Sequence, residues 1–162
     1  MAHYNKNAIF KNAESVAEYI TPLRKKGKTI VTTNGCFDII HGGHIEYLSE
    51  AASKGGILIV GVNCDKVVKK LKGGNRPVQG EDDRVAIVGA LKMVDCAFIF
   101  TEDDPCTFLE IIKPDIHVKG GDYTEDIIEK PVVEAYGGKV SIVSFKEGYS
   151  TTTIINKINA SI

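Results

Sequence analysis

The chain has 162 residues, of which 43% are hydrophobic and 25% charged, and its formal net charge at pH 7 is −1. This balance excludes a wholly disordered chain, and the near-zero charge excludes capture of nucleic acid by a general basic field. No apolar run approaches the roughly 20 residues of a membrane-spanning helix, and the opening MAHYNKNAIF lacks the layout of a signal peptide. We therefore expect a cytoplasmic protein with neither a membrane nor a nucleic-acid partner.

The cysteines bear on the redox state of the protein. Cys36, Cys64, Cys96 and Cys106 show no CxxC spacing and lie in or beside apolar segments. This distribution favours reduced thiols over a disulfide framework or a zinc finger.

Helical and strand-like segments alternate along the chain. A first helical pattern places Val16, Tyr19, Ile20 and Leu23 on one face, and further helices are predicted at about residues 44–53, 82–91, 105–112, 127–136 and 151–158. Strand-like runs occupy residues 29–33, 57–62, 96–100, 116–118 and 140–143. Strands that alternate with helices form parallel sheets through right-handed crossovers. The sequence therefore predicts an α/β, Rossmann-like domain of three layers, its parallel sheet covered by helices on both faces.

The site is expected in the loops that follow the strands. In parallel sheets of this kind, ligands bind beyond the carboxyl ends of the strands, at the point where the strand order reverses. We take residues 1–28 as an N-terminal helical extension and residues 29–162 as the domain that carries the site.

The first of these loops, TTNGCFDIIHGGH, carries the strongest chemical signal. Gly35 would let the chain leave the strand at a positive φ, and Gly42 and Gly43 would let the backbone approach a ligand closely. His41 and His44, three residues apart at a helix N-terminus, would point the same way toward a natural phosphate site. Two other interpretations are buried core histidines and half of a metal site completed by Cys36, Asp38 or Cys64. We favour contacts with phosphate groups, which suit the glycines and the helix end.

The segment GCFDIIHGGH resembles the GxFDxxHxGH signature of the cytidylyltransferase-like nucleotidyltransferases. Three further segments extend the resemblance over most of the chain: VNCD with the basic stretch after it, VKGGDY, and EGYSTTTII. The resemblance implies in-line transfer of a nucleotide from a nucleoside triphosphate to a phosphorylated acceptor. The magnesium ion would be held by nucleotide oxygens and water, without a dedicated metal site in the protein.

The resemblance also implies roles for particular residues. The catalytic candidates are His41, His44 and Lys72, the last as a point charge for the β- and γ-phosphates. The residues expected to bind the nucleotide are Asn34, Gly35, Cys36, Phe37, Asp38, Lys119, Gly120, Asp122, Glu147, Gly148, Ser150, Thr151 and Thr152. The candidates for the substrate phosphate are Arg76, Arg84 and Lys146. Asp38 would either orient its loop or bind magnesium.

Details of these motifs are most similar to the adenylyltransferase domain of the bacterial bifunctional heptose kinase–adenylyltransferases. That similarity implies transfer of AMP from ATP to D-glycero-D-manno-heptose 1-phosphate, which gives ADP-heptose for lipopolysaccharide. It also implies a homodimer and, in a chain of this length, a separate sugar kinase. The alternative within the family is glycerol-3-phosphate cytidylyltransferase, or another nucleotidyltransferase that uses CTP and a sugar or alcohol phosphate. The usual pattern of the glycerol-3-phosphate enzymes has Thr in place of Cys36 and Arg where Lys92 and Phe145 stand here.

Two interpretations of another class remain. A nucleotide-sensing subunit would bind the triphosphate without releasing pyrophosphate. A metal-dependent hydrolase would use His41, His44 and Cys36 to hold zinc.

Overall fold

The computed structural model describes residues 8–121, 127–144 and 148–161. Five parallel strands form one sheet in the order β3-β2-β1-β4-β5. Their bounds are β1 Ile30–Gly35, β2 Ile57–Asn63, β3 Cys96–Phe100, β4 Ile116–Gly120 and β5 Lys139–Val143. The helices are α1 Ala13–Lys25, α2 Gly42–Ser53, α3 Asp65–Lys72, α4 Glu81–Gly89, α5 Cys106–Ile112, α6 Glu129–Glu134 and α7 Thr151–Asn159. The predicted α/β Rossmann-like architecture is confirmed.

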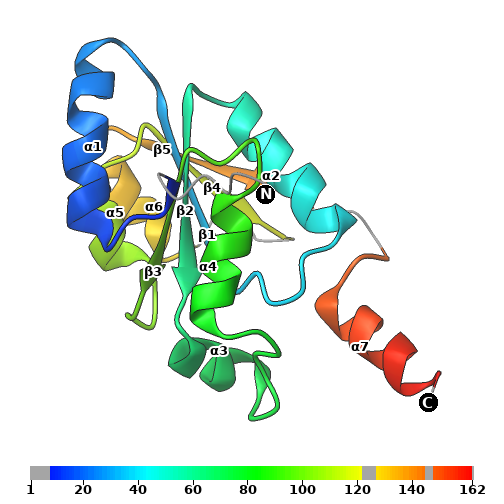
Figure 1. Ribbon diagram of the computed structural model, residues 1–162. Helices are drawn as coiled ribbons and strands as arrows, with labels where there is room; N and C mark the ends of the chain where they lie inside the picture. Colours follow the sequence, from blue (N-terminus) through cyan, green and yellow to red (C-terminus); the bar gives the residue numbers. More distant parts are fainter. Residues whose placement is uncertain (1–7, 122–126, 145–147, 162) are drawn as a thin grey trace, which may run out of the picture.

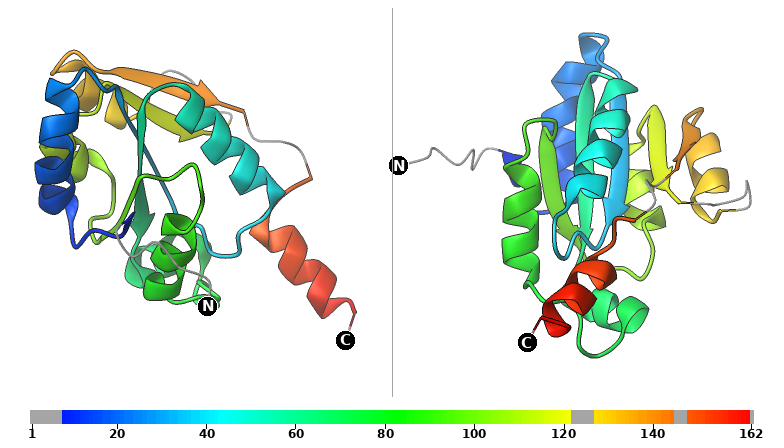
Figure 2. Two further views of the ribbon diagram at one scale, coloured as in Figure 1. Left: turned by 45° about the horizontal axis from the view of Figure 1, so that its top comes forward. Right: turned by 90° about the vertical axis from the view of Figure 1, so that its right-hand side faces the viewer.

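Helices cover both faces of the sheet, as Figures 1 and 2 show. On one face, α2 and α4 pack onto the strands through side chains such as Leu48 and Val88. On the other face, α1, α5 and α6 bury a second cluster that includes Ile20, Leu109 and Val133. Every residue of β2 is buried, because this strand has a neighbour on each side and helices above and below.

The helix α1 belongs to this core. Its N-cap Asn12 accepts a hydrogen bond from the Ser15 backbone N–H, and the Ser15 hydroxyl closes a capping box. Val16 and Ile20 are buried against the sheet layer. The helix therefore covers the sheet even though it lies within the stretch that we take as an N-terminal extension.

Helix α3 was not expected from the sequence, where the lysines read as a basic stretch. Val67 and Val68 lie on its buried side, and Lys69, Lys70 and Lys72 occupy its last turn. Cations are favourable at this end of a helix because they complement its dipole. The same lysines thus both stabilise the helix end and place Lys72 at its C-terminus.

Helix α7 differs from the others in having no buried residue. It projects from the body of the molecule in the views of Figures 1 and 2. None of the helices in the described part of the chain has both the length and the apolar character needed to span a bilayer. The four cysteines are free thiols, as expected.

Candidate active site

A cavity of about 580 Å³ lies at the carboxyl ends of β1 and β4. The chain passes from β1 outward to β2 and β3, and later returns to place β4 on the other side of β1, so the strand order reverses at this point. Most of the residues expected at the site line this one cavity: Asn34, Gly35, Cys36, Phe37, Asp38, His41, His44, Lys72, Arg76, Lys119, Gly120, Ser150, Thr151 and Thr152. Segments separated by more than 100 residues in sequence therefore meet where the topology predicts a ligand.

The two histidines stand together at the start of α2. His41 is the N-cap residue, and its ring stacks on that of His44 with centroids 3.8 Å apart and planes 23° from parallel. Burial lowers the pKa of both rings, and for His44 burial together with the charge of His41 lowers it to about 4. Both imidazoles are therefore neutral at pH 7 in the free protein. A neutral imidazole still offers one N–H to a phosphate oxygen, and a bound anion would raise its pKa.

The two glycines between these histidines allow the close approach of another side chain, that of Tyr149, rather than of a ligand. A Cβ on Gly43 would lie 2.9 Å from the Cβ of Tyr149 and 3.1 Å from Nδ1 of His41. A Cβ on Gly42 would lie 3.1 Å from the Tyr149 ring, which also stacks on His41 at a centroid distance of 6.2 Å. Tyr149 thus reaches α2 from the segment before α7, and the glycines permit that approach.

The expectation that Gly35 takes a positive φ is wrong. In the loop after β1 the left-handed residue is Phe37, with a φ of 47°. Gly35 is needed because the Phe37 ring folds back over it, and a Cβ there would lie 3.0 Å from that ring. The tight turn is formed two residues later than the sequence suggested.

Asp38 orients a loop rather than standing free for a metal ion. Its carboxylate accepts hydrogen bonds from the backbone N–H groups of Val78 and Gln79, each at 2.9 Å, and pairs with Arg76 Nε. Burial opposes ionisation, but these hydrogen bonds outweigh it and lower the pKa of Asp38 below its ordinary value. Of the two roles considered for Asp38, the geometry favours the first.

Arg84 does not line the cavity, which corrects its assignment as a phosphate contact. The side chain is fully buried. Its guanidinium donates to the carbonyl oxygens of Gln79, Cys36 and Asn63 and to the carboxylate of Asp65. A planar fork of five donors suits this set of acceptors. Arg84 thereby joins the catalytic loop, the end of β2, the start of α3 and the loop before α4.

The YSTT segment forms the start of α7. Ser150 is the N-cap and accepts a hydrogen bond from the Thr153 backbone N–H at 3.0 Å. The Thr151 hydroxyl donates to the Ile39 carbonyl at 3.4 Å, which ties α7 to the catalytic loop. Gly148 precedes this turn with a φ of 86° and does not line the cavity. Asp122, Lys146 and Glu147 lie outside the described residues.

Cys36 lies half-buried in the cavity wall. Burial raises the pKa of its thiol, although the positive charges of Lys72, Arg84 and Arg76 act in the opposite direction. A thiol with a raised pKa is a poor nucleophile at neutral pH. The geometry therefore gives no support to a covalent role for Cys36.

Magnesium fits this site as a companion of the triphosphate. Within the described residues no group of three or more His, Cys, Asp or Glu side chains could hold a metal ion. Asp38 is committed to protein donors. Mg²⁺ commonly keeps several waters and binds substrate phosphates, so the donor set suits an ion carried largely by the nucleotide.

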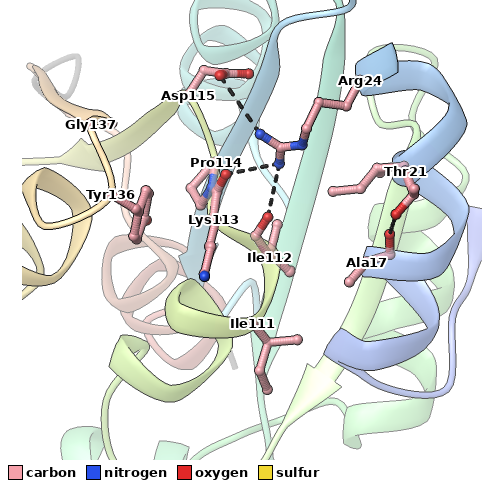
Figure 3. A pocket seen from close by; sticks show the side chains of 12 residues that line it. Ala17, Thr21, Arg24, Ile111, Ile112, Lys113, Pro114, Asp115, Tyr136 and Gly137 are labelled. Atoms are coloured by element: carbon pink, nitrogen blue, oxygen red, sulfur yellow. Dashed lines mark hydrogen bonds and ion pairs between the residues drawn. The ribbon is translucent and has the colours of Figure 1, made fainter.

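A second hollow, of about 350 Å³, lies at the opposite edge of the sheet, beside the starts of β4 and β5 (Figure 3). Arg24 crosses it, donates to the carbonyl oxygens of Ile112 and Lys113, and lies 3.8 Å from the Asp115 carboxylate. These contacts join α1 to the end of α5. We interpret this hollow as a structural joint, far from the catalytic histidines.

Some residues of the cavity were not anticipated from sequence. They are Tyr47, Asn63, Leu71, Asp103, Asp104, Pro105, Ile128, Glu129 and Tyr149. Tyr149 could have been predicted, because it belongs to the EGYSTT segment. Asp103, Asp104 and Glu129 carry no motif, and the packing of α5 against α6 brings the loop before α5 and the start of α6 to the cavity.

Comparison with known proteins agrees with this geometry. The cytidylyltransferase-like family model matches residues 32–158. The chain belongs to this family. It is 47% identical over 158 residues to the bifunctional protein HldE of Geotalea uraniireducens, and 47% identical over 157 residues to that of Geobacter metallireducens. The match covers 97% and 96% of this chain but 32% of each relative, so the chain spans about a third of their length.

Two solved structures are similar to this chain in fold. The lipopolysaccharide core biosynthesis protein of Thermoplasma volcanium has a TM-score of 0.63 and 34% identity, covering 76% of this chain and 100% of its own. The pantoate-beta-alanine ligase of Francisella tularensis has the same TM-score at 19% identity, covering 94% of this chain and 77% of its own. The second likeness concerns the fold alone.

Proposed function

We propose that the protein transfers AMP from ATP to D-glycero-D-manno-heptose 1-phosphate and releases ADP-heptose and pyrophosphate. The observation that carries the proposal is the stacked pair of His41 and His44 at the N-terminus of α2, in one cavity with Lys72 and the start of α7. The motifs that resemble heptose adenylyltransferases favour the heptose acceptor over glycerol 3-phosphate. Similarity to a protein described as acting in lipopolysaccharide core biosynthesis supports the same choice.

The reaction requires positioning and charge stabilisation more than proton transfer. A phosphate oxygen of the acceptor attacks the α-phosphorus in line, and the bond from that phosphorus to the bridging oxygen of the β-phosphate breaks. An ionised phosphate nucleophile has no proton to lose, so no general base is needed. His41 and His44 donate N–H groups to phosphate oxygens in the transition state, and Lys72 holds the β- and γ-phosphates.

The remaining assignments complete this proposal. Asn34, Gly35, Cys36, Phe37, Lys119, Gly120, Ser150, Thr151 and Thr152 surround the nucleotide, and we extend that role to Asp122, Glu147 and Gly148. Arg76, held by Asp38, and Lys146 serve the acceptor phosphate. Magnesium bound to the triphosphate neutralises part of its charge. A cytoplasmic sugar kinase, acting as a separate chain, supplies the sugar 1-phosphate.

We also propose that the protein acts as a homodimer in which α7 packs against a second copy. Ile154, Ile155 and Ile158 share one face of α7, and no residue of this helix is buried in the single chain. Ile158 is 53% exposed. Ile154 and Ile155 are half-buried, and an apolar helical face that stays partly exposed in this way favours association.

The experiment that tests the activity is an assay of pyrophosphate release with magnesium present. ATP or CTP is crossed with heptose 1-phosphate or glycerol 3-phosphate. Turnover confined to ATP with heptose 1-phosphate is the expected result. Turnover with CTP and glycerol 3-phosphate would replace the heptose assignment by the alternative within the family. Binding of ATP without turnover in any combination would favour a nucleotide sensor.

A further inference from the structure

The cavity is bordered by elements from both faces of the sheet. On the face of α2, the imidazoles of His41 and His44, together with the start of α7, suit phosphate groups. On the face of α5 and α6, which we call the second end, the wall is formed by residues next to these helices and by the end of β1: Asn34, Asp104, Pro105, Ile128 and Glu129. Carboxylates do not attract phosphates. The second end therefore calls for a part of the substrate that donates hydrogen bonds.

Glu129 is the central residue of this second end. Its side chain is only 2% exposed, although it belongs to the cavity wall. Its Oε1 accepts a hydrogen bond from Lys119 Nζ, and the described residues provide no partner for Oε2. A buried carboxylate is costly unless its acceptor sites are used. Lys119 uses one of the two oxygens and leaves the other for a donor from the cavity.

Asn34 provides a second, independent acceptor at the same end. Its Oδ1 is buried and has no hydrogen-bond partner among the described residues. Pro105 and Ile128 add apolar surface to the surrounding wall. A sugar matches both features, because its hydroxyl groups donate hydrogen bonds while its C–H faces pack on apolar side chains.

We propose that this end of the cavity binds the hydroxyl groups of the sugar acceptor, with Glu129 as a specificity-determining residue and Asn34 as its companion. The inference rests on the proposed function, since it assumes that the phosphate of the acceptor lies toward His41 and His44. In this arrangement Glu129 selects a polyhydroxylated acceptor by its hydroxyl groups. Loss of a hydroxyl group would leave a buried acceptor unpaired, which is the strongest basis for rejecting an analogue.

The test measures binding directly, by calorimetry, to the 162-residue chain carrying a non-hydrolysable ATP analogue. The acceptors are heptose 1-phosphate, mannose 1-phosphate and glycerol 3-phosphate. Glu129→Gln keeps the size of the side chain and removes its charge. We expect it to weaken the binding of the sugar 1-phosphate by about tenfold or more, as for loss of a hydrogen bond to a charged group, and to leave the Kd of the ATP analogue within about twofold.

The matched control is Glu134→Gln, which makes the same change at an exposed position of the same helix. Asn34→Ala provides a second variant if Glu129→Gln fails to fold. Because Asn34 also borders the proposed nucleotide site, the readout is a difference: we expect the Kd of the sugar phosphate to weaken by about fivefold more than that of the ATP analogue. Equal weakening of the ATP analogue and the acceptor would overturn the proposal, because a ribose contact or a structural role for Glu129 would have that effect. Unchanged acceptor binding would overturn it as well.

A failure of the proposed function can be distinguished from a failure of the hydroxyl subsite. If the wild type binds glycerol 3-phosphate and neither sugar phosphate, the heptose assignment is wrong, and the hydroxyl subsite then stands only if Glu129→Gln still weakens glycerol 3-phosphate selectively. If none of the three acceptors binds, both proposals are overturned.

Discussion

The surroundings of each charged or titratable side chain in this protein determine whether it can contact a ligand. His41 and His44 stack at the N-terminus of α2, and burial lowers the pKa of both rings. In the mechanism that we propose, this position lets them donate to developing negative charge. Arg84 carries a permanent charge but has no access to a ligand, because four protein oxygens surround it. Residue type alone would have assigned all three to phosphate groups.

The histidines provide the first prediction. We expect His41→Ala and His44→Ala each to lower kcat by at least about 100-fold, because each removes a donor that acts in the transition state. Steady-state pyrophosphate release at saturating ATP measures the effect. Cys36→Ser, a change in the same loop, should keep most of the activity, since the reaction needs no sulfur nucleophile. Turnover close to wild type in either histidine variant would contradict the proposed mechanism.

Arg84 provides the second prediction. Lys at this position presents a single ammonium group, which cannot satisfy four acceptors on four segments. We expect Arg84→Lys to lower the free energy of unfolding by about 2–3 kcal/mol, measured by urea denaturation. Arg24→Lys is the matched control, because Arg24 also donates to two carbonyl oxygens but is exposed. We expect Arg24→Lys to lower the free energy of unfolding by less than about 1 kcal/mol. Equal losses would contradict the role that we assign to Arg84.

At the scale of elements, the catalytic helix depends on a segment distant in sequence. Tyr149 lies against the first turn of α2, and Thr151 bonds to the Ile39 carbonyl in the loop before that helix. Asp38 in turn holds the loop that follows α3. The site therefore consists of loops that hold one another in place.

The third prediction tests the contact between Tyr149 and α2. A methyl group on Gly43 meets the Cβ of Tyr149 and Nδ1 of His41, neither of which can move without displacing the backbone or the catalytic ring. We expect Gly43→Ala to lower kcat by about tenfold through misplacement of His41. Gly42→Ala meets only the exposed ring of Tyr149 and should cause a smaller loss. Assays of both variants beside their thermal melts separate lost geometry from lost folding, and a larger effect of Gly42→Ala would exclude this explanation.

At the scale of the whole molecule, a buried histidine couples folding to pH. His117 in β4 is fully buried, and its Nδ1 lies 2.9 Å from the Thr32 hydroxyl. Burial, with a smaller contribution from the charge of Lys119, lowers the pKa of His117 to about 3. The unfolded chain binds a proton below about pH 6.5 while the folded chain does not, so stability falls as pH decreases from that value toward 3.

The fourth prediction follows from this linkage. Between pH 7 and pH 5, His117 should account for about 2 kcal/mol of lost stability, with His44 acting in the same direction. His117→Asn should reduce the pH dependence by about that amount, measured by urea denaturation at both pH values. Asp38 does not contribute to this pH dependence, because its lowered pKa keeps its carboxylate ionised between pH 7 and pH 5. An unchanged pH dependence would show that His117 is protonated in the folded protein.

The fifth prediction concerns assembly. We expect the wild type to have the mass of a dimer by light scattering, and the double variant Ile155→Glu with Ile158→Glu to have that of a monomer, because charges on the apolar face of α7 would be buried at the interface. Asn156→Glu, on the opposite side of the helix, should remain dimeric. A dimeric double variant would place the interface elsewhere, and a monomeric wild type would reject the homodimer.

The sequence by itself determined the fold class, the family and the loops that meet at the site. Local patterns were sufficient for these: alternating strands and helices, and motifs such as HGGH and YSTT that follow strands in a fixed order. Parallel strands place their carboxyl ends at one edge, so the meeting of these loops followed from the order of elements alone.

Only the tertiary structure decided which charged residues face the cavity. Arg84 and Glu129 are both buried and charged, yet one holds loops together inside the protein and the other lines the cavity wall. Helix α3 was also not predicted from the sequence, because two buried valines among five charged residues form too short a hydrophobic pattern to indicate a helix. The physical reason is that the burial of a side chain depends on contacts with segments distant in sequence. The residue type alone does not show which segments will pack against it.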